Sequence, residues 1–273
     1  MVETLPPDIR LRLEQTLAQW RAWRCQPTLE GPPPIVRLLS GGLSNYTIVV
    51  GSDSQYVIRI DGKQVHSNRL SRTAEWRVLQ SAHAASIAPG PRYFNPDLGA
   101  MVSDYHIEVE DKTAPTADIA ALLRAIHAQP SIHYKLDLGE RINNYERQID
   151  PSVPQPSPPL RETALVALQQ LSEEPQTTVL CHNDLLAANR LNTSSGLMAI
   201  DWEYCAMGSP WFDLAVVIVG DKINDTEKHT LINAYLQRAP TAQEQFTLER
   251  YCQVYRYLEQ LWYLANKGVP LNP

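Results

Sequence analysis

Two stretches decide the fold, Val179-Leu180-Cys181-His182-Asn183-Asp184-Leu185-Leu186-Ala187-Ala188-Asn189 and, after a segment that reads as a hairpin, Ala199-Ile200-Asp201-Trp202-Glu203-Tyr204. In the first stretch a short apolar strand leads into Asp184 and Asn189, and in the second an apolar strand ends at Asp201. Phosphoryl transfer requires an oriented hydroxyl group and hard oxygen ligands for Mg²⁺. We expect Asp184 to orient the hydroxyl group, and Asn189 and Asp201 to bind the metal.

Each of these residues also has an ordinary structural interpretation. Asp184 alone fits a turn in which its carboxylate accepts backbone N–H bonds, Asp201 alone fits a helix cap, and Asn189 alone fits a turn. These readings do not explain why all three residues occur together in this order and spacing. The combination therefore favours the catalytic interpretation.

The composition limits the classes of protein that the chain can belong to. The 273 residues are 44% apolar and 20% charged, which is typical of a folded globular protein. The net charge of −6 gives no reason to expect nucleic-acid binding. The four cysteines form no CxxC pair, the N-terminal residues do not resemble a secretory signal, and the apolar run Leu214 to Gly220 is too short to span a membrane. We expect a cytoplasmic protein with no membrane partner. The sequence does not fix the oligomeric state.

The periodicity changes along the chain. Strand-like alternation occurs mainly in the first part of the chain, and helical spacing dominates after about residue 106. A proline-rich loop covers Pro151 to Pro159. The predicted strands are Tyr46 to Val50, Tyr56 to Ile60 and Ala100 to Tyr105, and the predicted helices are Ile9 to Trp23, Leu70 to Ala85, Ala117 to Ala128, Arg161 to Ser172 and most of the chain after Phe212.

Three motifs resemble those of the kinase-like small-molecule phosphotransferases, the family of choline kinases, thiamine kinases and aminoglycoside phosphotransferases. The motifs are His182, Asp184 and Asn189 in an H-x-D-x-x-x-x-N arrangement, the stretch Ile200 to Tyr204, and the stretch Gly208 to Ala215. The resemblance implies that Asp184 is the catalytic aspartate and that Asn189 and Asp201 bind Mg²⁺. It also places His182 in the catalytic set, where it braces the loop together with Asp213.

The resemblance extends more weakly to the N-terminal half. It implies that Ser40 to Asn45, including Ser44, covers the phosphates of ATP, that Arg59 contacts them, and that Glu75 is the helix partner of Arg59. Adenine would lie near Met101. The loop lacks a G-x-G-x-x-G pattern, and arginine stands where the family usually has lysine, which is not a neutral exchange.

The resemblance implies a two-lobed α+β, protein-kinase-like fold. Residues 1–105 would form a nucleotide-binding lobe with a small antiparallel sheet and a leading helix, and residues 106–273 a mainly helical catalytic and acceptor-binding lobe. The expected activity is ATP-dependent phosphorylation of a small-molecule hydroxyl, as in choline or thiamine kinases. An aminoglycoside phosphotransferase and a nucleotide-binding protein without catalysis are the alternatives.

The acceptor is expected to be a small molecule, with an organic cation as the first choice. Glu203 could supply a carboxylate for it, and Trp262 an aromatic face for a cation–π contact. Aromatic residues at helical spacing are, however, more typical of a buried core. The C-terminal aromatic residues concerned are Tyr251, Tyr255, Tyr257, Trp262 and Tyr263.

Overall fold

The computed structural model describes residues 5–39, 45–62, 70–109, 114–174 and 177–266. By its internal contacts the chain divides into two units, Met1–Lys112 with Leu191–Glu203, and Thr113–Arg190 with Tyr204–Pro273. The segment Leu191–Glu203 therefore joins the first unit, although it follows much of the second in sequence. The division at residue 105 into an N-terminal nucleotide-binding lobe and a C-terminal acceptor-binding lobe stays a prediction.

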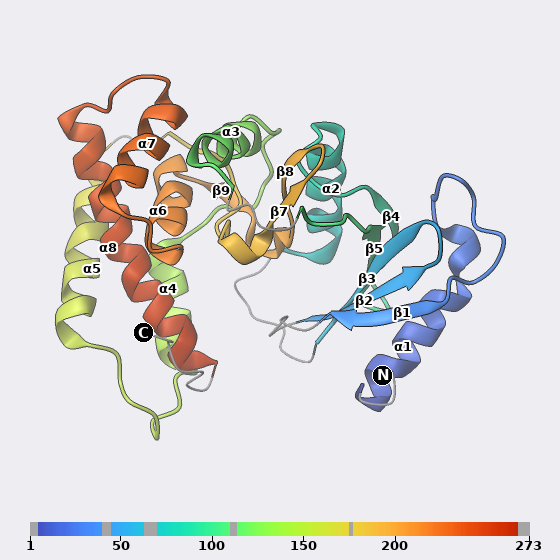
Figure 1. Cartoon of the computed structure of the whole chain (residues 1–273). Helices are drawn as coiled ribbons and strands as arrows, with labels where there is room; N and C mark the ends of the chain where they lie inside the picture. The colour runs from blue at the N-terminus through green and yellow to red at the C-terminus, as the bar shows by residue number, and fades with distance from the viewer. Residues whose placement is uncertain (1–4, 40–44, 63–69, 110–113, 175–176, 267–273) are drawn as a thin grey trace. The chain divides into compact units, whose positions relative to one another are not determined.

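The first unit contains a five-stranded antiparallel sheet in the order β1-β2-β3-β5-β4 (Figure 1). Its strands are β1 (Ile35–Leu39), β2 (Asn45–Gly51), β3 (Gln55–Asp61), β4 (Pro91–Asn95) and β5 (Ala100–Asp104). Burial alternates along β3, where Tyr56, Ile58 and Ile60 are buried and the residues between them are less so. This alternation gives the sheet one strongly apolar face.

Helix α1 (Pro7–Ala18) packs on that apolar face. Ile9 and Leu13 are buried with Ile58 and Ile60 in one hydrophobic cluster. Helix α2 (Arg72–Ala84) begins at Ser71, whose side chain accepts the N–H of Ala74. Trp76 of α2 stacks on Phe94 of β4 with ring centroids 5.4 Å apart.

The segment that returns to the first unit is bound to it by main-chain hydrogen bonds. The hairpin of β7 (Arg190–Thr193) and β8 (Gly196–Ala199) precedes Asp201. The N–H of Ala199 donates to the carbonyl of Ile87 at 2.8 Å, and the N–H of Leu70 donates to the carbonyl of Glu203 at 2.9 Å. Asp201 and Glu203 are thereby fixed beside the start of α2.

The second unit is mainly helical. A two-stranded sheet pairs β6 (Val179–Cys181) with β9 (Ala206–Gly208). The long α8 (Ala242–Ala265) packs against α4 (Leu138–Gln148), α5 (Pro158–Ser172) and α6 (Pro210–Gly220) (Figure 1). Helix α6 is apolar on almost every side and nearly all of it is buried, as expected for a central core helix. The other α-helices described in this unit are α3 (Thr116–His127) and α7 (Asp225–Leu236). None of the helices in the described part of the chain is long and apolar enough to cross a membrane.

Candidate active site

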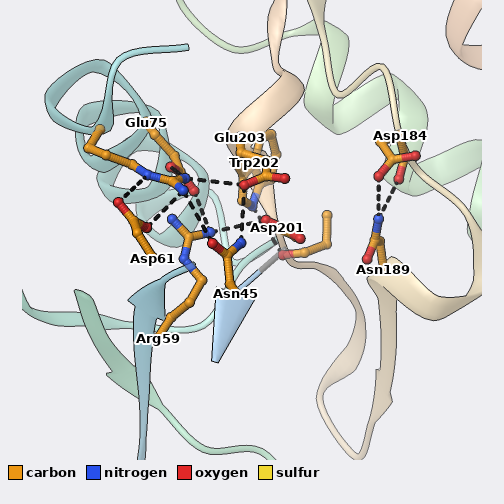
Figure 2. A network of polar contacts seen from close by, with 11 residues as sticks. Asn45, Arg59, Asp61, Glu75, Asp184, Asn189, Asp201, Trp202 and Glu203 are labelled. Atoms are coloured by element: carbon orange, nitrogen blue, oxygen red, sulfur yellow. Dashed lines mark hydrogen bonds and ion pairs between the residues drawn. The ribbon is translucent and has the colours of Figure 1, made fainter. Parts of the chain in front are cut away.

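A network of two arginines, four carboxylates and one amide lies in the first unit (Figure 2). Strand β3 contributes Arg59 and Asp61, the start of α2 contributes Arg72 and Glu75, and the returning segment contributes Asp201 and Glu203. We call this set, completed by Asn45 of β2, the arginine–carboxylate network. The network has four carboxylates and only two guanidinium groups, so its formal charge is negative. This charge favours the binding of a further cation.

Arg59 joins the sheet, α2 and the returning segment. Its Nη1 atom lies 2.7 Å from Oε1 of Glu75 and 3.0 Å from Oδ1 of Asp201. Thr47 and Met101 are the cross-strand partners of Arg59, which places the Met101 side chain on the same face of the sheet as the guanidinium group. The structure thus brings together four residues that the sequence singled out, Arg59, Glu75, Asp201 and Met101.

Arg72 organises the other side of the network. Its guanidinium group binds Asp61 through Nε at 2.9 Å and Nη2 at 2.7 Å, in the two-pronged geometry that suits arginine and carboxylate. Its Nη1 atom also contacts Oε2 of Glu75 at 2.7 Å and Oε2 of Glu203 at 3.3 Å. Asn45 donates to the same Glu203 oxygen at 3.1 Å. Glu203, which is only 2% exposed, is therefore engaged within the protein.

Burial and charge act against each other in this network. Burial alone would lower the pKa of Arg59, but the carboxylates of Glu75 and Asp201 outweigh it and raise the pKa. Burial alone would raise the pKa of Glu75, but Arg59 and Arg72 hold it below its ordinary value. Burial and then the neighbouring Glu203 raise the pKa of Asp201 to about 6. Burial is thus the main cause of the shift at Asp201, although its side chain is 34% exposed.

The second unit holds the loop that follows β6, and Asp213 at the start of α6 fixes its backbone. The fully buried carboxylate of Asp213 accepts the main-chain N–H of His182 at 2.7 Å and that of Asn183 at 2.6 Å. Asn183 has a left-handed backbone with φ of 63°, and its side-chain amide donates to the carbonyl of Tyr204 at 3.0 Å. Asparagine tolerates this conformation better than most residues, so the turn that presents Asp184 is locally encoded.

The amide of Asn189 clamps Asp184. Its Nδ2 atom donates to the carbonyl oxygen of Asp184 at 2.8 Å and to the carboxylate Oδ2 at 2.9 Å (Figure 2). The amide nitrogen is used in this clamp, so the amide oxygen of Asn189 is the atom suited to a metal. At the end of α6, Asp221 accepts the N–H of Ala187 at 2.9 Å and pairs with Arg190 at 2.7 Å.

One face of α8 presents aromatic and acidic side chains in the electrostatic range of Asp184. Tyr255, Glu259 and Tyr263 are spaced four residues apart and so lie on one side of the helix. Burial first, and then the Asp184 carboxylate, raise the pKa of Tyr255. Burial, Glu259 and Asp184 raise the pKa of Tyr263, against which Trp262 packs edge to face at 5.2 Å.

Some aromatic residues of α8 belong to the core. Tyr257 is fully buried and its hydroxyl donates to Glu146 of α4. Tyr251 is also buried and packs edge to face on Phe212. Tyr255 is buried as well and packs edge to face on Phe212. The ordinary interpretation of the aromatic stripe therefore applies to these three residues.

The sequence-predicted residues separate into two groups. Arg59, Glu75, Asp201, Glu203 and Met101 lie in the first unit, whereas His182, Asp184, Asn189 and Trp262 lie in the second. A shared metal site of Asn189 and Asp201 stays a prediction. Ser44 and the rest of the segment 40–44 lie outside the described residues.

Several residues of these groups were not found from the sequence. Arg72 could have been found from its spacing, because it stands three positions before Glu75 on the same helix and residues at this spacing form ion pairs. Asp61 and Asp221 had no such signal, because their arginine partners lie 11 and 31 positions away in other elements, so that no helical or strand period relates the pairs. His127 of α3 had none either, because its partner Asp213 lies 86 positions away.

The antiparallel sheet and the mainly helical second unit are the fold of small-molecule phosphotransferases. Residues 35–252 match the model of the phosphotransferase enzyme family, so the chain belongs to this family. It is an ATP-dependent small-molecule kinase, and the resemblance, the fold class and the enzyme class predicted from the sequence are confirmed.

Among curated proteins, the thiamine kinase of Shigella flexneri is 31% identical over 245 residues, which are 85% of this chain and 80% of that protein. Among solved structures, a choline/ethanolamine kinase family protein from Mesorhizobium loti superposes with a TM-score of 0.73 at 23% identity, covering 95% of this chain and 89% of the other. Choline kinase LicA from Streptococcus pneumoniae superposes with a TM-score of 0.70 at 21% identity over 85% of each chain. These two structures support the fold.

Proposed function

We propose that the chain transfers the γ-phosphoryl group of ATP to the hydroxyl group of a small organic cation, with thiamine as the first candidate and choline as the second. The observation that carries the proposal is the clamp of Asn189 on Asp184, on a loop whose backbone Asp213 fixes. A carboxylate held in this way is suited to orient a hydroxyl group for attack.

Each of the two proposed metal ligands is of a type that suits Mg²⁺. Asp201 offers a carboxylate and Asn189 an amide oxygen, and hard oxygen atoms are the ligands that Mg²⁺ prefers. When bound, Mg²⁺ would neutralise the charge that develops on the phosphates. Arg59 would contact the phosphates of ATP while Glu75 holds it in place. The resemblance implies the other roles: His182 braces the loop that carries Asp184, Ser44 belongs to the segment that covers the phosphates, and Met101 lies near the adenine.

The charge of the acceptor follows from α8. Trp262 and Tyr263 offer aromatic faces, and Glu259 offers a carboxylate whose pKa burial raises while Lys222 opposes the shift. A bound organic cation would stabilise the ionised form of Glu259 and would gain from the aromatic faces. We propose Glu259 for this role, because Glu203 is buried and already binds Arg72 and Asn45. The thiamine kinase relatives support a cationic acceptor.

The compartment is proposed from the cysteines. All four are free and buried, which suits a reducing cytoplasm.

The test measures ATP consumption with Mg²⁺ over thiamine, choline, ethanolamine, an aminoglycoside and a neutral sugar, with the phosphorylated product identified by mass. We expect thiamine or choline to have the highest kcat/KM, chelation of Mg²⁺ to abolish turnover, and Asp184→Asn to lose turnover while retaining ATP binding. Efficient use of the aminoglycoside or the sugar alone would reject the proposed acceptor. Undiminished turnover in Asp184→Asn would reject the catalytic assignment, and ATP binding without turnover on any acceptor would favour a nucleotide-binding protein.

A further inference from the structure

A hydrogen-bonded chain connects α7 and α3 to the loop that carries Asp184. The Tyr235 hydroxyl lies 2.8 Å from Nδ1 of His127, and Nε2 of His127 lies 3.1 Å from Oδ2 of Asp213. The same Asp213 carboxylate accepts the main-chain N–H groups of His182 and Asn183. The chain therefore ends on the residues that directly precede Asp184.

The direction of each hydrogen bond follows from the chemistry of the groups. An ionised carboxylate only accepts hydrogen bonds, so Nε2 of His127 must donate to Asp213. Whenever the imidazole is neutral, Nδ1 is then an acceptor, and the Tyr235 hydroxyl donates to it. Burial, Cys181 and Asp213 raise the pKa of Tyr235 to about 12, which keeps the phenol protonated and able to donate.

The same residues could be read as a metal site. In the part of the chain that the structure describes, His127, Cys181 and Asp213 form one group of possible ligands, with ligand atoms within 4.8 Å of one another. However, burial raises the pKa of the Cys181 thiol far above its ordinary value, and its sulfur donates to the carbonyl of Ser209 at 3.4 Å. The Cys181 thiol, Nε2 of His127 and Oδ2 of Asp213 are all used in hydrogen bonds within the protein, so the group serves as a hydrogen-bonded brace.

The brace is rigid because it is buried. Asp213 is fully buried and the His127 side chain is 5% exposed. Loss of the His127 donor would leave Oδ2 of Asp213 with fewer donors in a site that water does not readily enter, and an undersatisfied buried carboxylate is costly. The carboxylate would then shift toward other donors, and the backbone that it holds would shift with it.

We propose that His127 and Tyr235 are positioning residues for phosphotransfer, which fix Asp213 and through it the backbone that presents Asp184. This inference rests on the proposed role of Asp184. Small displacements of a reacting group reduce turnover strongly while substrate binding changes little. The pair is therefore expected to affect kcat more than the KM for ATP.

The experiment compares Tyr235→Phe with Tyr257→Phe by hydrogen exchange and steady-state kinetics. Tyr257 is a matched control, since its hydroxyl also donates a hydrogen bond to a side chain, that of Glu146. Glu146 is not part of the hydrogen-bonded series Tyr235, His127 and Asp213. In Tyr235→Phe we expect the main-chain amides of His182 and Asn183 to exchange about fivefold faster, which corresponds to the loss of one ordinary hydrogen bond. We also expect a lower kcat with an unchanged KM for ATP, and neither change in Tyr257→Phe.

A mutant cycle separates positioning from general stability. In a His127→Leu background, Tyr235→Phe should cause no further loss of kcat, because the chain is already broken. His127→Gln, whose amide can still donate to Asp213, should retain more kcat than His127→Leu. Equal losses in the two tyrosine variants, additive losses in the cycle, or faster exchange with unchanged kcat would each overturn the inference. The proposed function has a separate test, because it fails if Asp184→Asn retains turnover. In that case the exchange rates of the His182 and Asn183 amides still show whether His127 and Tyr235 hold this backbone.

Discussion

Removing the charge of Glu75 tests how the arginine–carboxylate network stabilises the first unit. Glu75 is 2% exposed and each of its oxygens contacts a different arginine at 2.7 Å. In Glu75→Gln one oxygen remains as a neutral acceptor, and the other is replaced by an NH₂ group that faces a guanidinium donor. One charge-assisted contact is lost and the other is weakened.

The expected loss follows from those two contacts. A hydrogen bond to a charged group contributes about 1.5–3 kcal/mol, so we expect the free energy of unfolding to fall by about 3 kcal/mol. This is the low end of the range of about 3–5 kcal/mol for breaking a buried ion pair. The low end applies because Arg59 keeps Asp201, and Arg72 keeps Asp61 and Glu203.

The effect has a defined pH dependence. The pKa of Glu75 is lower in the folded protein than its ordinary value of 4.5. Ionised Glu75 therefore stabilises the fold fully above the ordinary value, and this stabilisation is lost as the pH falls through that value toward the folded pKa. The difference between parent and variant should be constant near about pH 7 and should shrink below about pH 5.

The assay is urea unfolding followed by circular dichroism at several pH values. Glu244→Gln is the matched control, because Glu244 also binds an arginine, Arg238, but in an exposed pair, and glutamine preserves the capping box with Thr241. It should cost less than about 1 kcal/mol. Equal losses in both variants, or a Glu75→Gln loss that does not change with pH, would refute the reasoning.

Three further changes probe the proposed site. Asp201→Ala should weaken Mg²⁺-dependent ATP binding by removing a hard oxygen ligand, and equal affinity of parent and variant in calorimetry would contradict this. Trp262→Leu should raise the KM for a cationic acceptor about 2- to 30-fold, because a cation–π contact contributes about 0.5–2 kcal/mol, while the KM for ATP stays constant; a parallel rise in both constants would point to general damage. Asp221→Asn should lower kcat by weakening the ion pair with Arg190 at the end of the loop that follows Asp184. Kinetics identical to those of the parent would show that this pair does not support the loop.

Local pattern was enough to predict many elements of the fold. The strands around Tyr46 to Val50 and Tyr56 to Ile60 were predicted because their apolar residues recur with the period of a strand. Helix α4 was not predicted, since its surface is mostly polar and its buried residues are few, Arg141, Ile142 and Tyr145. Strand β4 begins with Pro91, a residue that argues against a strand in the sequence but is tolerated at the first position.

By itself the sequence determined the family and the fold class, because the order of Asp184, Asn189 and Asp201 is a linear pattern that resembles the family's motifs. The catalytic roles of these three residues stay predictions. The sequence also identified Arg59 and Glu75 through a resemblance. Only the tertiary structure decided which of these side chains form ion pairs and hydrogen bonds with one another. Arg59 reaches Asp201 across 142 positions of the chain, and His127 reaches Asp213 across 86. Such contacts depend on strand register and helix docking, which are set by the burial of the whole core, so no local periodicity encodes them.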